Sequence, residues 1–298
     1  MLNSFKTRQD ILYASKNGDS LYSIYQRLEE STLFLHEQQK STFEMLFETL
    51  LSSLSEKQAQ ELVIFPINRL DIVATTFSST IAQVLSKFQG NHLSFNRVQQ
   101  INEAVAQTLA QFQGKWLSLN GLQQIDEATA KALAQFQGKW LSLNGLQQID
   151  EEIAKALVQF KGNLLGLNGL KELDEATAKV LAQWQGDALY LNEVQQLDKA
   201  TANALAKWQG SYLFLNGVKQ VDEATAKALA QWRGYQLSLN GVKELDEATA
   251  KALAKWQGGA LSLSGLQQVD EATAKALAKY KGTIYTTESI LEQIDKYK

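Results

Sequence analysis

The residue types that most often carry catalysis or bind metal ions are scarce in this chain of 298 residues. Cysteine is absent, which excludes disulfides, thiol catalysis and Cys-based zinc sites, and two histidines, His36 and His92, cannot supply an ordinary His-rich site. The motifs GxSxG, HExxH, GxxxxGK[ST] and GxGxxG and the EF-hand loop are also absent. We therefore expect a protein that is not an enzyme and has neither a metal site nor a cofactor.

A row of regularly spaced aspartates is the pattern that most resembles a catalytic constellation. Its members are Asp126, Asp150, Asp174, Asp222, Asp246 and Asp270. Each one directly precedes a helical run, where a side-chain oxygen caps free backbone N–H groups and the helix dipole favours negative charge. We expect helix capping from these residues. For His92 we expect a place at the surface or against a terminal cap, and for His36 a place within that cap.

Charge and hydropathy exclude further classes of function. Lysine plus arginine total 29 against 32 acidic residues, so the net charge of −3 provides no strong basic field for nucleic acid or anionic lipid. No run of about 18 apolar residues is present for membrane insertion, and the start MLNSFKTRQDILYASKNGDS lacks the apolar stretch of a secretory signal. We expect a soluble protein, cytoplasmic or secreted without a conventional signal peptide.

The elements that must position any functional residue repeat with a period of 24 residues. The segment GKWLSLNGLQQID begins at Gly114 and again at Gly138, and EATAKALA recurs at multiples of the same spacing. Within each unit an LxL stretch alternates with period two and predicts a short strand. An aspartate, a helical run and a glycine suited to a left-handed turn follow, and they predict a helix that ends at Gly138 in the unit beginning at Leu117.

A unit of this size cannot bury its own apolar face, so the units must stack into a solenoid. We expect a curved α/β solenoid with parallel strands inside and helices outside. Residues 1–80 lack the period and predict an all-α N-terminal cap, with helices at about 19–30, 32–54 and 56–65. Residues 81–282 form about eight units, and residues 283–298 form a degenerate C-terminal cap.

The unit LSLNGLQQIDEATAKALAQFQGKW resembles a bacterial leucine-rich repeat of the type with one helix per unit. The resemblance covers roughly residues 81–282 and implies a binding scaffold, including the host-directed effectors that bacteria secrete. The family's turn asparagine is displaced, because Leu122 takes its place and Asn120 directly follows the second leucine. Asn120 either faces the inner surface beside Ser118 or turns to bond the backbone. A repeated Asn before Gly is a common turn device, which favours the structural interpretation.

The strand positions that should face the inside of the curve are almost uncharged. Two aromatic clusters lie there, separated by a small patch around Gly166 and accompanied by small hydroxyl residues. We assign partner binding to Trp116, Trp140, Tyr190, Tyr212, Phe214, Ser118 and Ser142. Aromatic rings beside small polar residues are typical of recognition surfaces, although mutual stacking along the sheet explains the rings equally well. The aromatic residues at the helix ends, which repeat in every unit, should be core.

These observations predict an interaction scaffold that holds a protein or peptide on the concave sheet. One alternative is a carbohydrate-binding module in which the same rings stack on sugars and Asn120, Asn144 and Asn168 bond hydroxyl groups. Another alternative is a self-assembling structural protein, which would form a homo-oligomer. We expect no nucleic acid partner and no membrane insertion.

Overall fold

The structure is a computed structural model that describes residues 56–63, 68–72 and 74–298. The expected helices at 19–30 and 32–54, together with His36, lie outside the described residues. The expected helix at 56–65 corresponds to α4, Glu56–Leu62. In the described part of the chain, no helix is long and apolar enough to span a membrane.

Ten short strands form one parallel sheet whose spatial order is the order of the sequence. The strands are β1 Arg69–Asp71, β2 His92–Ser94, β3 Trp116–Ser118, β4 Trp140–Ser142, β5 Leu164–Gly166, β6 Ala188–Tyr190, β7 Tyr212–Phe214, β8 Gln236–Ser238, β9 Ala260–Ser262 and β10 Thr283–Tyr285. The sheet thus begins inside the segment expected as a cap, and residues 283–298 add a last strand and helix. The expected α/β solenoid of parallel strands is confirmed.

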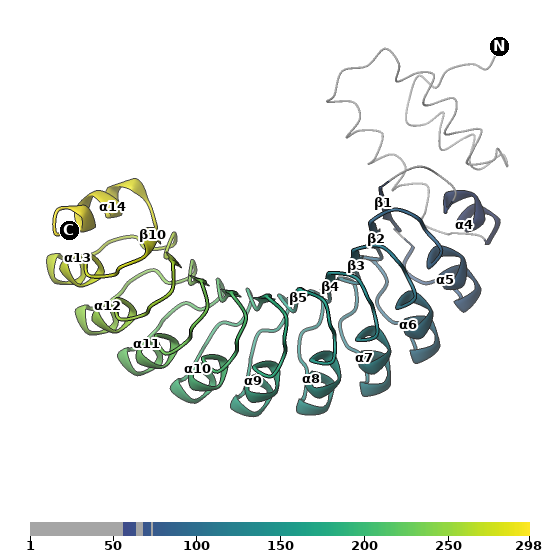
Figure 1. Cartoon of the computed structure of the whole chain (residues 1–298), viewed down its shortest axis with the longest axis horizontal. Helices are drawn as coiled ribbons and strands as arrows, with labels where there is room; N and C mark the ends of the chain where they lie inside the picture. Colours follow the sequence, from purple (N-terminus) through teal and green to yellow (C-terminus); the bar gives the residue numbers. More distant parts are fainter. Residues whose placement is uncertain (1–55, 64–67, 73) are drawn as a thin grey trace, which may run out of the picture.

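One helix follows each strand and returns the chain to the start of the next. After β1 these helices are α5 Ser79–Leu85, α6 Glu103–Leu109, α7 Glu127–Leu133, α8 Glu151–Leu157, α9 Glu175–Leu181, α10 Lys199–Leu205, α11 Glu223–Leu229, α12 Glu247–Leu253, α13 Glu271–Leu277 and α14 Glu288–Asp295. Figure 1 shows the described elements as an open arc with strands on the inner rim and helices on the outer rim.

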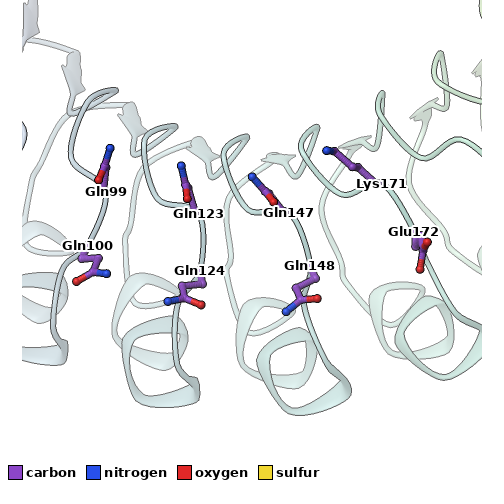
Figure 2. Close-up of a pocket in the computed structure, with 8 residues that line it drawn as sticks. All are labelled: Gln99, Gln100, Gln123, Gln124, Gln147, Gln148, Lys171 and Glu172. Atoms are coloured by element: carbon purple, nitrogen blue, oxygen red, sulfur yellow. The ribbon is translucent and has the colours of Figure 1, made fainter.

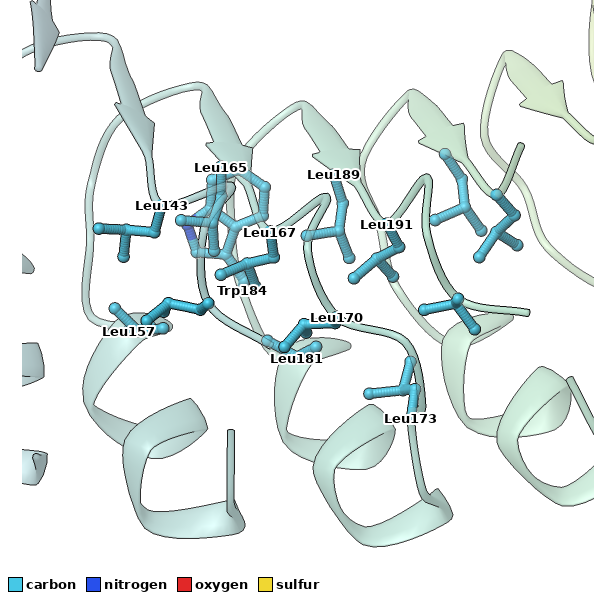
Figure 3. Close-up of a cluster of buried hydrophobic side chains, with 14 of the residues drawn as sticks. Leu143, Leu157, Leu165, Leu167, Leu170, Leu173, Leu181, Trp184, Leu189 and Leu191 are labelled. Atoms are coloured by element: carbon cyan, nitrogen blue, oxygen red, sulfur yellow. The ribbon is translucent and has the colours of Figure 1, made fainter. Parts of the chain in front are cut away.

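The core lies between the sheet and the helices. The middle residue of each inner strand, such as Leu165 or Leu189, is fully buried and points toward the helix layer, where Leu181 and its equivalents meet it (Figure 3). Because side chains alternate across a strand, the first and third residues of each strand face the inside of the arc. The sheet register preserves this arrangement, since Leu117 pairs with Leu141 and Leu141 with Leu165.

Aspartate caps begin most helices, as predicted. The side chain of Asp126 accepts a hydrogen bond from the Thr129 N–H at 2.7 Å, and the other five predicted caps do the same at 2.7–2.8 Å. On the outer face of the helices, Lys179 pairs with Glu175 at 2.6 Å, one of several such i,i+4 pairs. These acids are therefore structural and lie apart from the concave sheet.

The predicted role of the helix-end glycine is wrong. Helix α7 ends at Leu133 with Ala134 as its C-cap, before Gly138 is reached, and none of the described glycines has a left-handed φ. Gly138 is needed for packing instead, because an added Cβ would lie 2.1 Å from Cζ of the Phe136 ring. The glycine lets the buried ring fold back against its own chain.

Those rings form a continuous stack along the core, which confirms their expected burial. Neighbouring centroids lie 5.7–6.4 Å apart with nearly parallel planes. The members are Phe88, Phe112, Phe136, Phe160, Trp184, Trp208, Trp232, Trp256 and Tyr280. Strands pair about 4.8 Å apart, so the distance between units increases outward from the sheet. This difference bends the solenoid with the strands inside.

Candidate functional site: the concave face of the sheet

The seven residues predicted to bind a partner all lie on the inner-facing positions of the strands. The first strand position carries Trp116, Trp140 and Tyr212, and the third carries Ser118, Ser142, Tyr190 and Phe214. Between β3 and β9 these two positions hold no aspartate, glutamate, lysine or arginine. The strands therefore position the rings on one uncharged strip.

The aromatic residues form one row instead of two separate clusters. The ring centroids of Trp116 and Trp140 lie 4.5 Å apart, those of Trp140 and Tyr190 5.5 Å, and those of Tyr190 and Phe214 4.5 Å. Trp140 reaches Tyr190 across β5, on which Gly166 is the residue in register with Tyr190. The small patch around Gly166 therefore does not separate the two clusters.

Tyr212 lies beside this row and packs elsewhere. Its ring and that of Tyr235 pack edge to face, with a centroid distance of 6.0 Å and an angle of 66° between their planes. Tyr235 precedes β8, is 55% exposed and was not among the predicted site residues. We define the aromatic row as Trp116, Trp140, Tyr190 and Phe214, with Tyr212 and Tyr235 as a neighbouring pair.

Exposure differs sharply among the predicted site residues. Trp116 is 40% exposed, whereas the other four rings are half-buried. Ser118 and Ser142 are buried, and their hydroxyl groups donate hydrogen bonds to Asn96 and Asn120 at 2.8 and 2.7 Å. The rings can contact a partner, while both serine hydroxyl groups already serve the fold.

The asparagines after the strands form a ladder that answers the question left open for Asn120. Its Oδ1 atom accepts hydrogen bonds from the Ser142 hydroxyl and from the Asn144 N–H, one unit later, at 2.7 and 3.0 Å. The same N–H bond links successive units at 2.9–3.4 Å from Asn96 to Ser264. Asn120 lies beside the inner strip and also bonds the backbone, so the structural interpretation is confirmed.

The ladder also explains an unsatisfied polar group. Ser94 is the β2 equivalent of Ser118, but its buried Oγ has no hydrogen-bond partner among the described residues. In the first unit Ile72 corresponds to Phe95, because the Ile72 N–H bonds the Ser94 carbonyl as the Phe95 N–H bonds the Ser118 carbonyl. Val73 follows Ile72 in the sequence where Asn96 follows Phe95, so the ladder asparagine that would serve Ser94 is missing. The repeat pattern therefore ends at this unit.

Among the described residues, charged side chains and the one imidazole of the concave face lie on the first two strands, β1 and β2. His92 lies 5.3 Å from Trp116 between ring centroids, and Arg69 forms an ion pair with Asp71 on β1. Burial of the imidazole and the nearby Arg69 guanidinium lower the pKa of His92, while Asp71 opposes that shift. Burial also raises the pKa of the Tyr190 hydroxyl.

Sequence reasoning missed two grooves along the turns that leave the strands. The larger, about 500 Å³, is lined by a pair of polar residues from each of four successive turns: Gln99, Gln100, Gln123, Gln124, Gln147, Gln148, Lys171 and Glu172 (Figure 2). A second, about 420 Å³, lies nearby and includes Arg97, Asn120 and Gly145. The repeated Gln-Gln pair at a 24-residue spacing was the available signal. Neither groove contains a ring of the aromatic row.

Two further observations bear on identity and chemistry. Among the described residues, no group of three or more histidine, aspartate or glutamate side chains is placed to hold a metal ion. Comparison of the chain with protein-family models gives no match, and comparison with curated proteins gives none either. The repeating strand–helix units of about 24 residues in a parallel sheet establish the architecture, a repeat solenoid.

Proposed function

We propose that this protein is a non-enzymatic scaffold that binds an extended protein or peptide segment on its concave sheet. The observation that carries the proposal is the continuous aromatic row, which spans β3 to β7 and is only partly covered. Aromatic rings that present exposed edges on an uncharged strip are typical of binding hot spots. Exposed aromatic surface of this kind normally needs a partner to cover it.

A peptide fits the row better than a sugar does. Carbohydrate binding of the expected kind needs free ring faces, but Tyr190 lies between Trp140 and Phe214, which stack on it with planes within 9°. The Oδ1 atoms of Asn120, Asn144 and Asn168 are already occupied in the ladder. The exposed parts of these rings, chiefly those of Trp116, remain for a partner, and they suit apolar side chains of a peptide.

We also infer kinship with the leucine-rich repeat proteins of bacteria. Strands of LxL sequence on an inner sheet, helices outside, and an asparagine ladder that serves each turn support this inference. The relation further suggests an effector that acts in the cytoplasm or after secretion without a conventional signal peptide. Architecture alone does not name a partner.

The test is selection from a displayed peptide library on the full chain. Peptides enriched on the wild type should bind the variant Trp116→Ala/Trp140→Ala/Phe214→Ala at least tenfold more weakly. Tyr297→Ala is the matched control, because it removes an equally exposed ring, 40%, outside the concave face. Because Trp140 and Phe214 are half-buried, Trp116→Ala alone provides a variant with little risk to folding.

Three results would overturn the proposal: enriched peptides that bind the triple variant as tightly as the wild type, no enrichment above an unrelated protein, or hits on a glycan array that the triple variant loses. Sedimentation velocity over a concentration range tests whether the protein associates with itself through the aromatic row. Association of the wild type that Trp116→Ala abolishes would assign the row to a second copy of the chain.

A further inference from the structure

The chain direction sorts all turns of the solenoid into two flanks. Strands are parallel and every helix runs back, so the turns from helix to strand lie along one edge of the sheet and the turns from strand to helix along the other. The first group comprises residues 86–91, 110–115, 134–139, 158–163, 182–187, 206–211, 230–235, 254–259 and 278–282. We call this group the basic flank.

The basic flank carries nine basic residues and one acidic residue, Asp187. The basic residues are Lys87, Lys115, Lys139, Lys161, Lys207, Arg233, Lys255, Lys279 and Lys281. All nine are exposed, and none forms an ion pair with another described residue. The lysines on the helices differ, since six of them pair with a glutamate four residues earlier.

The opposite flank has the opposite charge. Its turns, from residue 95 to residue 270, hold four basic residues and ten acidic ones, seven of which are helix N-caps. The net charge of −3 thus averages two flanks of different sign. A field that is weak for the whole chain is strongly positive over one face.

Helix electrostatics account for only part of the basic flank. Lys87, Lys207, Lys255 and Lys279 directly follow a helix C-cap, where a cation complements the helix dipole. The other five basic residues stand three or five positions beyond the C-cap, and the dipole effect falls off within the last turn of a helix. The helix dipole therefore does not explain why these five residues are positively charged.

The charge is most concentrated at the C-terminal end of the flank. A groove of about 430 Å³ between the ends of α12 and α13 is lined by Lys251, Lys255, Lys279 and Lys281 together with small and amide residues. Lys251 pairs with Glu247, which leaves three ammonium groups for an anion. Ammonium groups of this number around a hollow suit a phosphate group.

We propose that the basic flank binds the surface of an anionic phospholipid membrane, with the lysine groove receiving a lipid phosphate. The arc is viewed in Figure 1 along the shortest axis of the molecule, with its helices nearly end-on, so each flank is one broad face of a thin body. A broad face lets the basic residues of eight of these turns approach a flat surface together. Polybasic surfaces of this kind bind anionic lipid through additive contributions of each lysine.

The same geometry is less suited to nucleic acid. Single-stranded nucleic acid sites combine basic residues with exposed aromatic rings on which bases stack. On the basic flank Tyr235 is the one exposed large aromatic residue among the described residues, and Arg233 is the one arginine. A flank that is rich in lysine and lacks a row of exposed aromatic rings for base stacking is better suited to a lipid surface.

Vesicle co-sedimentation with the full chain tests the proposal. The wild type should bind phosphatidylserine–phosphatidylcholine vesicles at low salt, release them at high salt, and ignore pure phosphatidylcholine. The variant Lys255→Gln/Lys279→Gln/Lys281→Gln should bind about 100-fold more weakly, since each lysine contributes roughly a fivefold factor. The matched control Lys171→Gln/Lys219→Gln/Lys243→Gln removes three exposed lysines from the opposite flank and should bind like the wild type.

Equal losses in the two lysine variants would overturn the proposal, because overall charge would then explain binding. Absence of vesicle binding at low salt would overturn it too, as would binding of inorganic phosphate or single-stranded RNA in preference to vesicles. Unchanged far-UV circular dichroism of both variants excludes misfolding. The Trp116→Ala variant should keep full vesicle binding, which separates this result from the fate of the peptide-binding proposal.

Discussion

At the scale of single residues, the asparagine that follows a strand hydrogen-bonds the backbone of the next unit and, in several units, a serine of the inner strip. Asn144 accepts a hydrogen bond from the Asn168 N–H at 3.0 Å, and its Nδ2 donates to the Ser142 hydroxyl at 2.8 Å. Each such side chain satisfies a backbone donor in the next unit that the parallel sheet leaves without a carbonyl. The asparagines thus hold the turns in register.

Asn144→Ala should destabilise the protein, because the partly buried Asn168 N–H loses its acceptor. The expected cost is about 1–3 kcal/mol in the free energy of unfolding. Chemical denaturation monitored by circular dichroism measures it. Asn163→Ala is the control: that side chain is exposed and outside the ladder, so its removal should cost less than about 0.5 kcal/mol. Equal costs for the two variants would contradict the structural role of the ladder.

At the scale of elements, each seven-residue helix depends on its cap. Helices this short are marginal in isolation, so a side chain that satisfies a free N–H at the first turn matters. In α9, α10, α11 and α12 the Thr backbone N–H, and then the Thr hydroxyl, lowers the pKa of the capping aspartates Asp174, Asp198, Asp222 and Asp246. Helix α6 uses the uncharged cap Asn102 in the same way.

These lowered pKa values predict a pH dependence with a definite sign. A carboxylate whose folded-state pKa is depressed contributes stability above its unfolded pKa, about 3.9 for aspartate, and loses it as pH falls through the folded value. The wild type should therefore lose stability from roughly pH 4 downward through these groups.

Replacing the four aspartates by asparagine should flatten this part of the profile, because asparagine caps a helix nearly as well and does not titrate. Thermal unfolding at several pH values between 7 and 2.5 gives the comparison. The two proteins should have similar midpoints near pH 7 and diverge below pH 4, the variant falling less. Parallel profiles over the whole range would show that the caps do not carry the acid sensitivity.

At the scale of the whole molecule, stability comes from stacking nearly identical units. Residues 114–126 and 138–150 have the same sequence, and β3 and β4 occupy equivalent places in the sheet. The ring stack of the core and the asparagine ladder link each unit to its direct neighbours. The solenoid should therefore tolerate a change of length by whole units.

Deleting residues 123–146 removes one full period and joins Leu122 to Gln147, which recreates the existing Leu146–Gln147 junction. This shortened chain should fold with the same circular dichroism per residue, a cooperative transition and a slightly lower midpoint. Deleting residues 123–134 removes α7 and half a period, and it should abolish the cooperative transition since β3 and β4 lose their crossover. Retention of cooperative unfolding in the half-period deletion would contradict unit-by-unit stacking.

The sequence alone determined the solenoid, the aspartate caps, the buried rings and the residues of the inner strip. The 24-residue period and the alternation of LxL constrain each of these locally, since every unit repeats the same short-range pattern. The sequence-based prediction was wrong where the packing of a buried ring decides the outcome. It assigned Gly138 to a left-handed turn, whereas the constraint comes from the Phe136 ring folding back over it.

Only the tertiary structure decided how side chains from different units combine. Trp140 stacks on Tyr190 across the intervening strand β5, a contact that no spacing along the chain reveals. The serines of the strip are covered because asparagines of preceding units reach their hydroxyl groups. Finally, the chain direction gathers basic residues from eight turns on one flank and acids on the other, so that a composition close to neutral becomes two charged faces.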